Sequence, residues 1–452
     1  MLRTVELPLW LLLLILLFAA VTFLSHFLFP SVRWFFRRRM ERAVAELNKR
    51  LERPIEPFKL ARRADTIQRL TYDRAVLAAV SEHAAEEGVP ENVALERARR
   101  YAREIVPSFS ATVYFRFAIR AARWLSEKLY DVRVVGPETV PAVDPEATVI
   151  FVMNHRSNMD YVLITYLVAD RSALSYAVGE WARVWPLSWL IRSMGAYFIR
   201  RRSRNTLYRR VLARYVQLAT EGGVTQAMFP EGALSLDGKV GAPKLGLLSY
   251  IMADFDPAEG RDVVFVPVAL NYDRVLEDRV LTEAAARGQR RFRATIPSAM
   301  WFMVRYVWRR WRGRAVRFGH AGVRFGAPLS LRGFLAERPA GQPKEVGAVL
   351  RDRMRAVVPV LPVPLVAWLV LRADAPVPRA ALVEQAGAIL AGLANPTLAG
   401  SAAQVVEAGL LGLTSRRILH EGPDGVAVAP GQSVLAAFYA NSVAHRFDAD
   451  AA

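Results

Sequence analysis

The stretch ATVIFVM, residues 147–153, followed by NHRSNMD, residues 154–160, decides the fold of this chain. Its first half is apolar and β-branched, as in a strand that is covered on both faces. In its second half, Ser157 and Asp160 stand three residues apart, as at a helix N-cap with an acidic N3 residue, and the apolar run 161–168 would continue that helix. The order of strand, polar turn and helix predicts an α/β fold with a site where the strand ends.

His155 and Asp160 are the candidate catalytic residues of this turn. We expect His155 in the turn and Asp160 in the first helical turn, so that the carboxylate reaches the Nδ1–H of the imidazole. An imidazole held in this way can take a proton from a hydroxyl, while the carboxylate fixes its tautomer and stabilises the imidazolium. Taken alone, the pair can equally be a polar loop histidine beside a helix-capping aspartate.

Three further clusters lie within or at the end of strand-like apolar runs and outline an α/β site with the first. They are GAYFIRRR at residues 195–202, FPEGALS at residues 229–235 and VPV at residues 266–268. Each has an alternative without function. The arginines after residue 200 can be a solvated or lipid-facing patch, the Pro-Glu-Gly sequence can be a plain turn, and Pro267 can be a strand-edge proline.

The ordered set of clusters resembles the motifs of the glycerolipid acyltransferase superfamily, which are His-x4-Asp, Gly-x-x-Phe-x-Arg, Phe-x-Glu-Gly-x-x-Ser and a Pro-centred apolar block. Within it, the chain is similar to the long, membrane-bound glycerol-3-phosphate acyltransferases. The stretch FYANS at residues 438–442, with His445, also resembles the end of those enzymes. The resemblance covers most of the chain after about Val132 and implies an α/β acyltransferase domain with a mixed sheet flanked by helices.

The resemblance also implies an activity. It is the transfer of a fatty acyl group from acyl-CoA or acyl-carrier protein to the sn-1 hydroxyl of glycerol 3-phosphate, which forms lysophosphatidic acid in phospholipid biosynthesis. His155 would deprotonate the hydroxyl, Asp160 would orient His155, and Pro267 would belong to the wall near the acyl donor. The acceptor site would be shaped by Gly195, Arg200, Glu231, Gly232 and Ser235, with Arg200 on the phosphate, since its planar fork matches phosphate oxygens.

One departure from the family pattern bears on the acceptor. The third motif usually carries Arg directly before its Ser and often a second basic residue after it, where this chain has Leu234 and Leu236. Lys239 and Lys244 are nearby cations that can compensate, although Lys acts as a point charge. Lysophosphatidic acid or dihydroxyacetone phosphate therefore stay alternative acceptors, and a non-catalytic membrane-binding scaffold is the alternative from another class.

Composition limits the partners. The chain has 452 residues, a formal net charge of +19 and no cysteine, so a thiol nucleophile, disulfides and cysteine metal sites are excluded. The histidines other than His155 show no paired spacing for zinc, and we expect neither a metal nor a cofactor. The positive charge favours anionic partners; since no nucleic-acid motif is present, we expect an anionic phospholipid membrane and no nucleic acid.

The N-terminus predicts a membrane anchor. Leu7 to Phe29 is almost continuously apolar, and about 23 helical residues span roughly 34 Å, enough for a bilayer core. A cleaved signal peptide is the alternative, but the run is long and lacks a small-residue cleavage pattern. Basic residues follow the run at once, so the positive-inside rule predicts a single-pass protein of the cell inner membrane with a cytoplasmic catalytic domain.

We expect four parts: an anchor at residues 1–30, a helical domain at 31–131, the acyltransferase domain at 132–335 and a helical C-terminal region at 336–452. The apolar stretch 357–371 contains prolines and is about 15 residues long, which favours a buried helix after an extended segment over a second span. Residues 301–311 resemble an interfacial helix or a core helix with a basic face. Trp181, Trp185 and Trp189 share one helical face and are expected to fill core or line an acyl channel.

Overall fold

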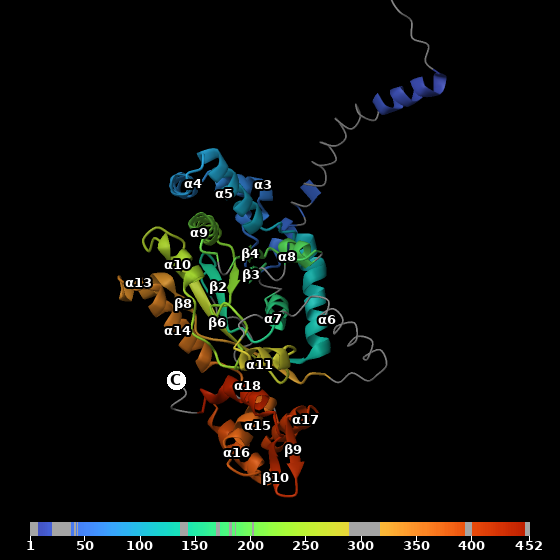
Figure 1. The fold of residues 1–452 in the computed structure, drawn as a ribbon, viewed down its shortest axis with the longest axis vertical. Helices are drawn as coiled ribbons and strands as arrows, with labels where there is room; N and C mark the ends of the chain where they lie inside the picture. Colours follow the sequence, from blue (N-terminus) through green and yellow to red (C-terminus); the bar gives the residue numbers. More distant parts are fainter. Residues whose placement is uncertain are drawn as a thin grey trace, which may run out of the picture. The chain divides into compact units, whose positions relative to one another are not determined.

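The computed structural model describes residues 8–19, 38–39, 42, 44–135, 143–168, 172–179, 183–185, 187–200, 203–288, 317–393 and 400–447. The chain forms two compact units, residues 1–55 with 170–172 and residues 56–169 with 173–452. In the first unit, residues 9–19 are helical (Figure 1). Over the described ranges no helix has both the length and the apolar character that a membrane span requires, and most of the remaining predicted anchor, like residues 301–311, lies outside them.

The second unit is built on a mixed sheet, as predicted. Among the described residues, its strands follow the order β1-β7-β6-β2-β5-β3-β4, and β8 pairs with β6. Neighbours are parallel except that β7 and β8 run antiparallel to β6. The bounds are β1 Asp131–Val135, β2 Thr148–Met153, β3 Ser175–Gly179, β4 Tyr197–Ile199, β5 Gln226–Met228, β6 Val263–Tyr272, β7 His320–Phe325 and β8 Leu329–Ser330.

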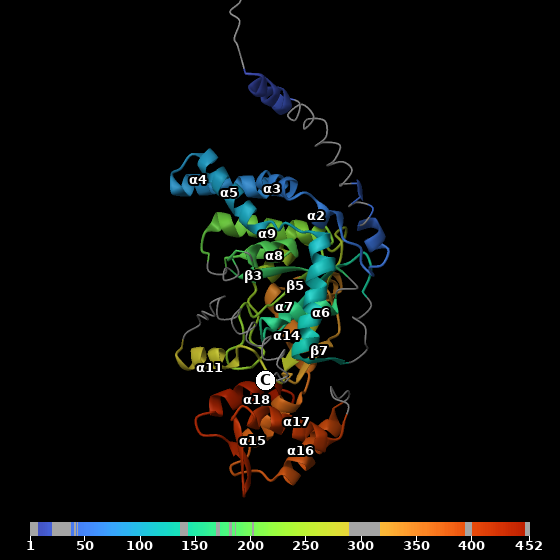
Figure 2. The same cartoon turned by 90° about the vertical axis from the view of Figure 1, so that its right-hand side faces the viewer.

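Helices cover both faces of this sheet because its strands are apolar on both sides. On β2, Phe151 and Met153 join one hydrophobic cluster while Ile150 and Val152 join the other, the alternation expected of a strand. The first cluster also contains side chains of α6 (Ile119–Leu129), α7 (Met159–Leu167), α15 (Pro362–Leu371), α16 (Arg379–Gly392), α17 (Ala402–Thr414) and α18 (Ser433–Ala444). The second cluster contains side chains of α3 (Arg63–Thr71), α4 (Arg74–Glu87), α5 (Glu91–Ile105), α9 (Thr206–Glu221), α10 (Gly246–Ala253), α13 (Leu331–Glu337) and α14 (Pro343–Ala356). Figure 2 shows α3, α4 and α5 beyond α9 at one end of the unit and α15 to α18 together at the other end.

The helix α15 confirms the prediction for the second apolar stretch. Residues 358–361 are buried and precede it without regular structure, and most of α15 is buried as well. Shorter elements complete the unit: α2 (Pro57–Leu60), the π-helix η1 (Thr112–Ala118), α8 (Leu187–Ser193), α11 (Asp278–Ala286) and the hairpin β9 (Leu419–Gly422) with β10 (Gly425–Val428).

The prediction that the tryptophans fill core is wrong where the structure describes them. Trp185 is 82% exposed and Trp189, on α8, is 59% exposed, so neither fills core. Trp185 lies in a turn before α8 begins at Leu187, so these two do not share a helical face, and the alternative of an acyl channel stays a prediction. Trp181 lies outside the described residues.

Candidate active site

The His155–Asp160 pair forms as predicted. The chain leaves β2 at Met153 and enters α7 at Met159, so the turn that carries His155 lies at the carboxyl end of a central strand. His155 Nδ1 lies 2.9 Å from Asp160 Oδ2, and both side chains are buried. With Nδ1–H donated to the carboxylate, Nε2 is the ring nitrogen that is left to take a proton.

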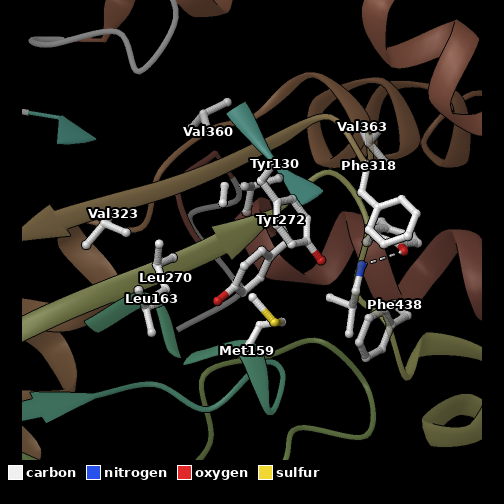
Figure 3. Close-up of a cluster of buried hydrophobic side chains, with 14 of the residues drawn as sticks. Tyr130, Met159, Leu163, Leu270, Tyr272, Phe318, Val323, Val360, Val363 and Phe438 are labelled. Carbon is white, nitrogen blue, oxygen red and sulfur yellow. Dashed lines mark hydrogen bonds between the residues drawn. The ribbon is translucent and has the colours of Figure 1, made fainter. Parts of the chain in front are cut away.

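Further donors fix the carboxylate of Asp160. Its Oδ2 also accepts the backbone N–H groups of Arg156, at 2.8 Å, and Ser157, at 3.0 Å. Its Oδ1 accepts the hydroxyl of Tyr272 at 2.7 Å. Tyr272 ends β6, which neighbours β2, and its ring packs on that of Tyr130 within a cluster of buried hydrophobic side chains (Figure 3). Several fixed donors leave Asp160 one orientation, which in turn sets the imidazole.

The assigned start of α7 lies one residue later than predicted, with Asn158 as the N-cap and no capping hydrogen bond from its side chain. The predicted contacts of Ser157 and Asp160 are nevertheless present, since Ser157 Oγ accepts the Met159 N–H at 3.1 Å and Asp160 Oδ2 accepts the Ser157 N–H at 3.0 Å. The Ser157 hydroxyl also donates to Glu277 at 2.8 Å, and Glu277 accepts from the Asn158 side chain at 3.0 Å. Burial raises the pKa of Glu277. Sequence reasoning gave neither Glu277 nor Tyr272 a role in the site, because each comes from more than a hundred residues further along the chain.

Aromatic rings and Glu231 hold His155 from the other side. The Phe229 ring stacks on the imidazole with centroids 4.1 Å apart, and the Tyr161 ring meets it edge-on at 5.5 Å. Glu231 Oε1 accepts the His155 backbone N–H at 3.0 Å, and Oε2 accepts the Gly241 N–H at 3.1 Å. Burial raises the pKa of Glu231 to about 7, although these N–H groups favour its ionised form. In this arrangement Glu231 shapes the His155 turn.

Ser235 and its neighbours organise the adjoining loop. The Ser235 N–H donates to the His155 carbonyl at 2.9 Å, and its buried hydroxyl donates to the Lys239 carbonyl at 2.8 Å. Leu234 and Leu236, which stand where the family pattern has basic residues, pack against the hydrophobic core. At these two positions the chain contributes packing and no positive charge.

A cavity of about 370 Å³ brings three of the predicted acceptor residues together. Arg200, Gly232 and Lys244 line it, with Arg209 and Phe229, the ring that stacks on His155. Gly232 has a φ of +68°, and a Cβ there would come within 2.9 Å of the Lys244 side chain. Arg200 follows β4 directly, and its Nε and Nη2 bind Glu104 of α5 at 2.8 and 2.6 Å.

Gly195 and Pro267 lie apart from this cavity. Gly195 precedes β4 and so lies at the other end of that strand from Arg200, where it lines a second cavity of about 250 Å³ with Lys59. Pro267 is buried within β6 between the residues that pair with β8 and those that pair with β7, and its carbonyl accepts the Gly326 N–H at 2.8 Å. A missing N–H is tolerated at such a junction.

Metal ligands do not gather in the described part of the chain: no group of three or more His, Cys, Asp or Glu side chains there could hold an ion. The absence of a metal or cofactor stays a prediction.

Two family models match the chain. The Acyltransferase model matches residues 131–271, which contain the His155 turn and the cavity. The model of the glycerol-3-phosphate acyltransferase C-terminal region matches residues 304–452, which include α15 to α18.

Curated relatives carry one name. Glycerol-3-phosphate acyltransferases from Pseudomonas entomophila and Ectopseudomonas mendocina are each 31% identical over 65% of this chain and 35% of their own length. That from Shewanella amazonensis is 29% identical over 63% of this chain and 34% of its own. The alignments thus span about a third of these relatives.

A solved structure of a 1-acyl-sn-glycerophosphate acyltransferase from Thermotoga maritima is 20% identical, with a TM-score of 0.34 over 65% of this chain and 94% of that one. That superposition is too loose for residues to be matched. The two family models and the shared name of these relatives agree, and the chain is similar to glycerol-3-phosphate acyltransferases over residues 131–271 and 304–452.

Proposed function

We propose that this chain transfers a fatty acyl group from acyl-CoA or acyl-carrier protein to the sn-1 hydroxyl of glycerol 3-phosphate. The observation that carries the proposal is the buried His155–Asp160 pair next to a cavity lined by Arg200, Arg209 and Lys244. Phe229 connects the two, since its ring stacks on the imidazole and lines the cavity. A base and a basic cavity are what a reaction between a hydroxyl and an activated acyl group requires, if the hydroxyl belongs to an anionic acceptor.

The mechanism is a direct transfer. His155 Nε2 takes the hydroxyl proton as the oxygen attacks the thioester carbonyl, and Asp160 stabilises the imidazolium through Nδ1–H. The tetrahedral oxyanion collapses, the C–S bond breaks, and the thiolate takes the proton back from Nε2. No acyl-cysteine can form, because the chain has no cysteine.

The phosphate of the acceptor would bind the cations of the cavity. Arg200 offers a planar guanidinium, and Arg209 and Lys244 add positive charge that Leu234 and Leu236 do not supply. Glu231, Gly232 and Ser235 would then act on the acceptor by shaping the two loops that carry His155 and Lys244. Gly195 and Pro267 would act from further away, through β4 and β6.

We place the protein at the cell inner membrane, as a single-pass protein with a cytoplasmic catalytic domain on an anionic bilayer, and we expect neither a cofactor nor a nucleic-acid partner. The apolar segment Leu7 to Phe29, the basic residues after it and the net charge of +19 support this proposal.

The test is acyl transfer from labelled palmitoyl-CoA and palmitoyl-carrier protein in membranes that contain the wild type or His155→Ala. Glycerol 3-phosphate, lysophosphatidic acid and dihydroxyacetone phosphate are offered as acceptors. We expect product from glycerol 3-phosphate that falls by about 10² or more in the variant, the usual contribution of a general base. His420→Ala, at an exposed histidine of β9, is the matched control.

If product forms only from one of the other two acceptors, glycerol 3-phosphate is not the acceptor. The absence of a basic residue at Leu234 would then explain the different preference. An active His155→Ala, or no reaction with any pair of substrates, would overturn the mechanism and favour a scaffold.

A further inference from the structure

Helix α5 holds the guanidinium of Arg200 by its side edge. Arg200 Nε lies 2.8 Å from Glu104 Oε1 and Nη2 lies 2.6 Å from Glu104 Oε2, a bidentate pair. Glu104 is only 7% exposed, near the end of α5, and its Oε1 also accepts from Arg183 Nη1 at 2.8 Å. A buried bidentate pair fixes both the position and the plane of the guanidinium.

Two tyrosine rings restrict the guanidinium further. The Arg200 Cζ lies 5.3 Å from the ring centre of Tyr101, on α5, and 5.4 Å from that of Tyr208, on α9. The Tyr208 hydroxyl also accepts the Arg200 backbone N–H at 2.9 Å, and the two rings meet edge-on with centroids 5.3 Å apart. Both the backbone and the side chain of Arg200 are thus fixed by neighbouring residues. Arg200 is therefore already ordered in the free protein, and a ligand that binds it loses little free energy to ordering it.

The other edge of the guanidinium stays available. Glu104 takes the side edge, Nε and Nη2, whereas the end edge carries Nη1, which donates no hydrogen bond to any residue in the described ranges. Arg200 lines the cavity with Lys244 and Arg209. An anion in that cavity can therefore meet the end edge while Glu104 stays on the side edge.

The cluster of Glu104, Arg200 and Arg183 carries a net positive charge. Burial alone would raise the pKa of Glu104, but the hydrogen bonds and charges of Arg200 and Arg183 outweigh it and lower the pKa. One carboxylate thus faces two guanidinium groups. The surplus positive charge matches the excess negative charge of a phosphate.

We propose that Glu104 and Tyr101 are positioning residues for the acceptor: α5 fixes Arg200 so that its end edge receives the acceptor phosphate. The N-terminal helices then have a part in acceptor recognition and not only in covering the sheet. The inference rests on the proposed function, because it concerns the acceptor cavity of the same site. The opposite role, in which Glu104 competes with the phosphate for Arg200, predicts the opposite change in KM.

The experiment compares steady-state kinetics of the full chain in membranes for wild type, Glu104→Gln, Glu104→Asp and Tyr101→Leu. Glu104→Gln keeps the shape of the side chain and removes its charge. We expect the KM for glycerol 3-phosphate to rise about tenfold or more, the usual effect of weakening one charged hydrogen bond. We expect kcat and the KM for palmitoyl-CoA to change little, and Glu104→Asp to restore part of the loss.

The matched control is Glu96→Gln, on the same helix, where Glu96 pairs with Arg99 at 2.6 Å on the surface. It should behave as wild type. Thermal unfolding of each variant separates a loss of structure from a loss of positioning, since a purely structural Glu104 would lower stability and kcat without selective effect on the acceptor KM.

A KM that stays constant or falls in Glu104→Gln, with the wild type active, overturns the inference. A wild type that does not acylate glycerol 3-phosphate overturns the proposed function instead. In that event, titration calorimetry with inorganic phosphate still decides the positioning role, which requires weaker binding to Glu104→Gln than to wild type and Glu96→Gln.

Discussion

At the residue scale, Asp160 joins the turn that carries His155 to the end of β6, a neighbouring strand. Its oxygens accept from the His155 imidazole, from two backbone N–H groups of the turn and from the Tyr272 hydroxyl. The first three donors are local in sequence, so a spacing of five residues was enough to predict the pair. Tyr272 and Glu277 could not be predicted in the same way, because only the pairing of β6 with β2 brings them near.

Tyr272→Phe tests the long-range part of this arrangement. The variant removes the hydroxyl that donates to Asp160 Oδ1 and keeps the ring on Tyr130. We expect kcat for acyl transfer to fall about tenfold, because one hydrogen bond to a charged group is lost, with little change in either KM.

Tyr166→Phe is the control, since Tyr166 lies on α7 and its hydroxyl donates to the surface residue Glu127. Equal rates for Tyr272→Phe and wild type would show that the backbone donors alone orient Asp160.

At the scale of elements, the loop after Glu231 meets helix α18 at Gly238. Gly238 has a φ of +90°, and a Cβ there would overlap the carbonyl group of Phe438. The buried Arg156 fastens the same junction, since its Nη1 donates to the Gly238 carbonyl at 2.6 Å and its Cζ lies 4.7 Å from the centre of the Phe438 ring.

Gly238→Ala should therefore lower the free energy of unfolding by more than about 2 kcal/mol, since it adds a clash to the strain of a left-handed backbone. Gly88→Ala isolates the strain, because Gly88 has a φ of +63° and no atom within 4 Å of an added Cβ, and should cost about 1 kcal/mol. Denaturant titrations of both variants give the comparison, and equal losses would contradict the clash.

A second histidine–aspartate pair joins β7 to the residue that follows β6. His320, which begins β7, has Nδ1 2.7 Å from Asp273 Oδ2, and Asp273 Oδ1 accepts the Val363 N–H at the start of α15. The hydrogen bond to Asp273 is the largest cause that raises the pKa of His320 above 6.5; Asp131 acts in the same direction, and burial and Arg133 oppose it.

This pair predicts a pH dependence of stability. A raised folded pKa means that the folded state binds the proton more tightly, so the contribution is complete below pH 6.5 and is lost as pH rises through the folded pKa. Thermal unfolding from pH 5.5 to 8.5 should show a decline in the wild type that His320→Gln flattens. Parallel curves for the two proteins would show that His320 is uncoupled from folding.

At the scale of the whole molecule, the sequence predicted where the motif strands lie and did not predict which distant parts of the chain contact one another. The motif strands β2, β4, β5 and β6 fell where their apolar runs predicted them. Three features were not predictable, because each depends on which distant surfaces meet. They are the pairing of β1 with β7, the binding of Arg200 by Glu104 of α5, and the exposure of Trp185. Apolar periodicity reports that a face exists and not what covers it.

We propose that the exposed tryptophans contact an anionic membrane, a partner that the net charge of +19 favours. Trp189 lies on α8, which contacts η1; Trp185 shortly before α8 and Phe117 of η1 are also exposed, Phe117 to 61%. Because the chain has no cysteine, a dye on Trp185→Cys reports on one place only. We expect its emission to shift to the blue with phosphatidylglycerol vesicles, while the same dye on Tyr72→Cys, at another exposed aromatic, should not respond; equal responses would contradict a local surface.

The pairing of β1 with β7 has a consequence for the synthesis of the protein on the ribosome. Asp131 pairs with His320, which the ribosome adds 189 positions later, about 10–40 s at ordinary elongation rates. Until then β1 emerges as a strand without its neighbour, an open edge on which another nascent chain could dock. The segment matched by the acyltransferase family model ends at residue 271, before that neighbour exists, so its first strand is completed only by the part of the chain that follows.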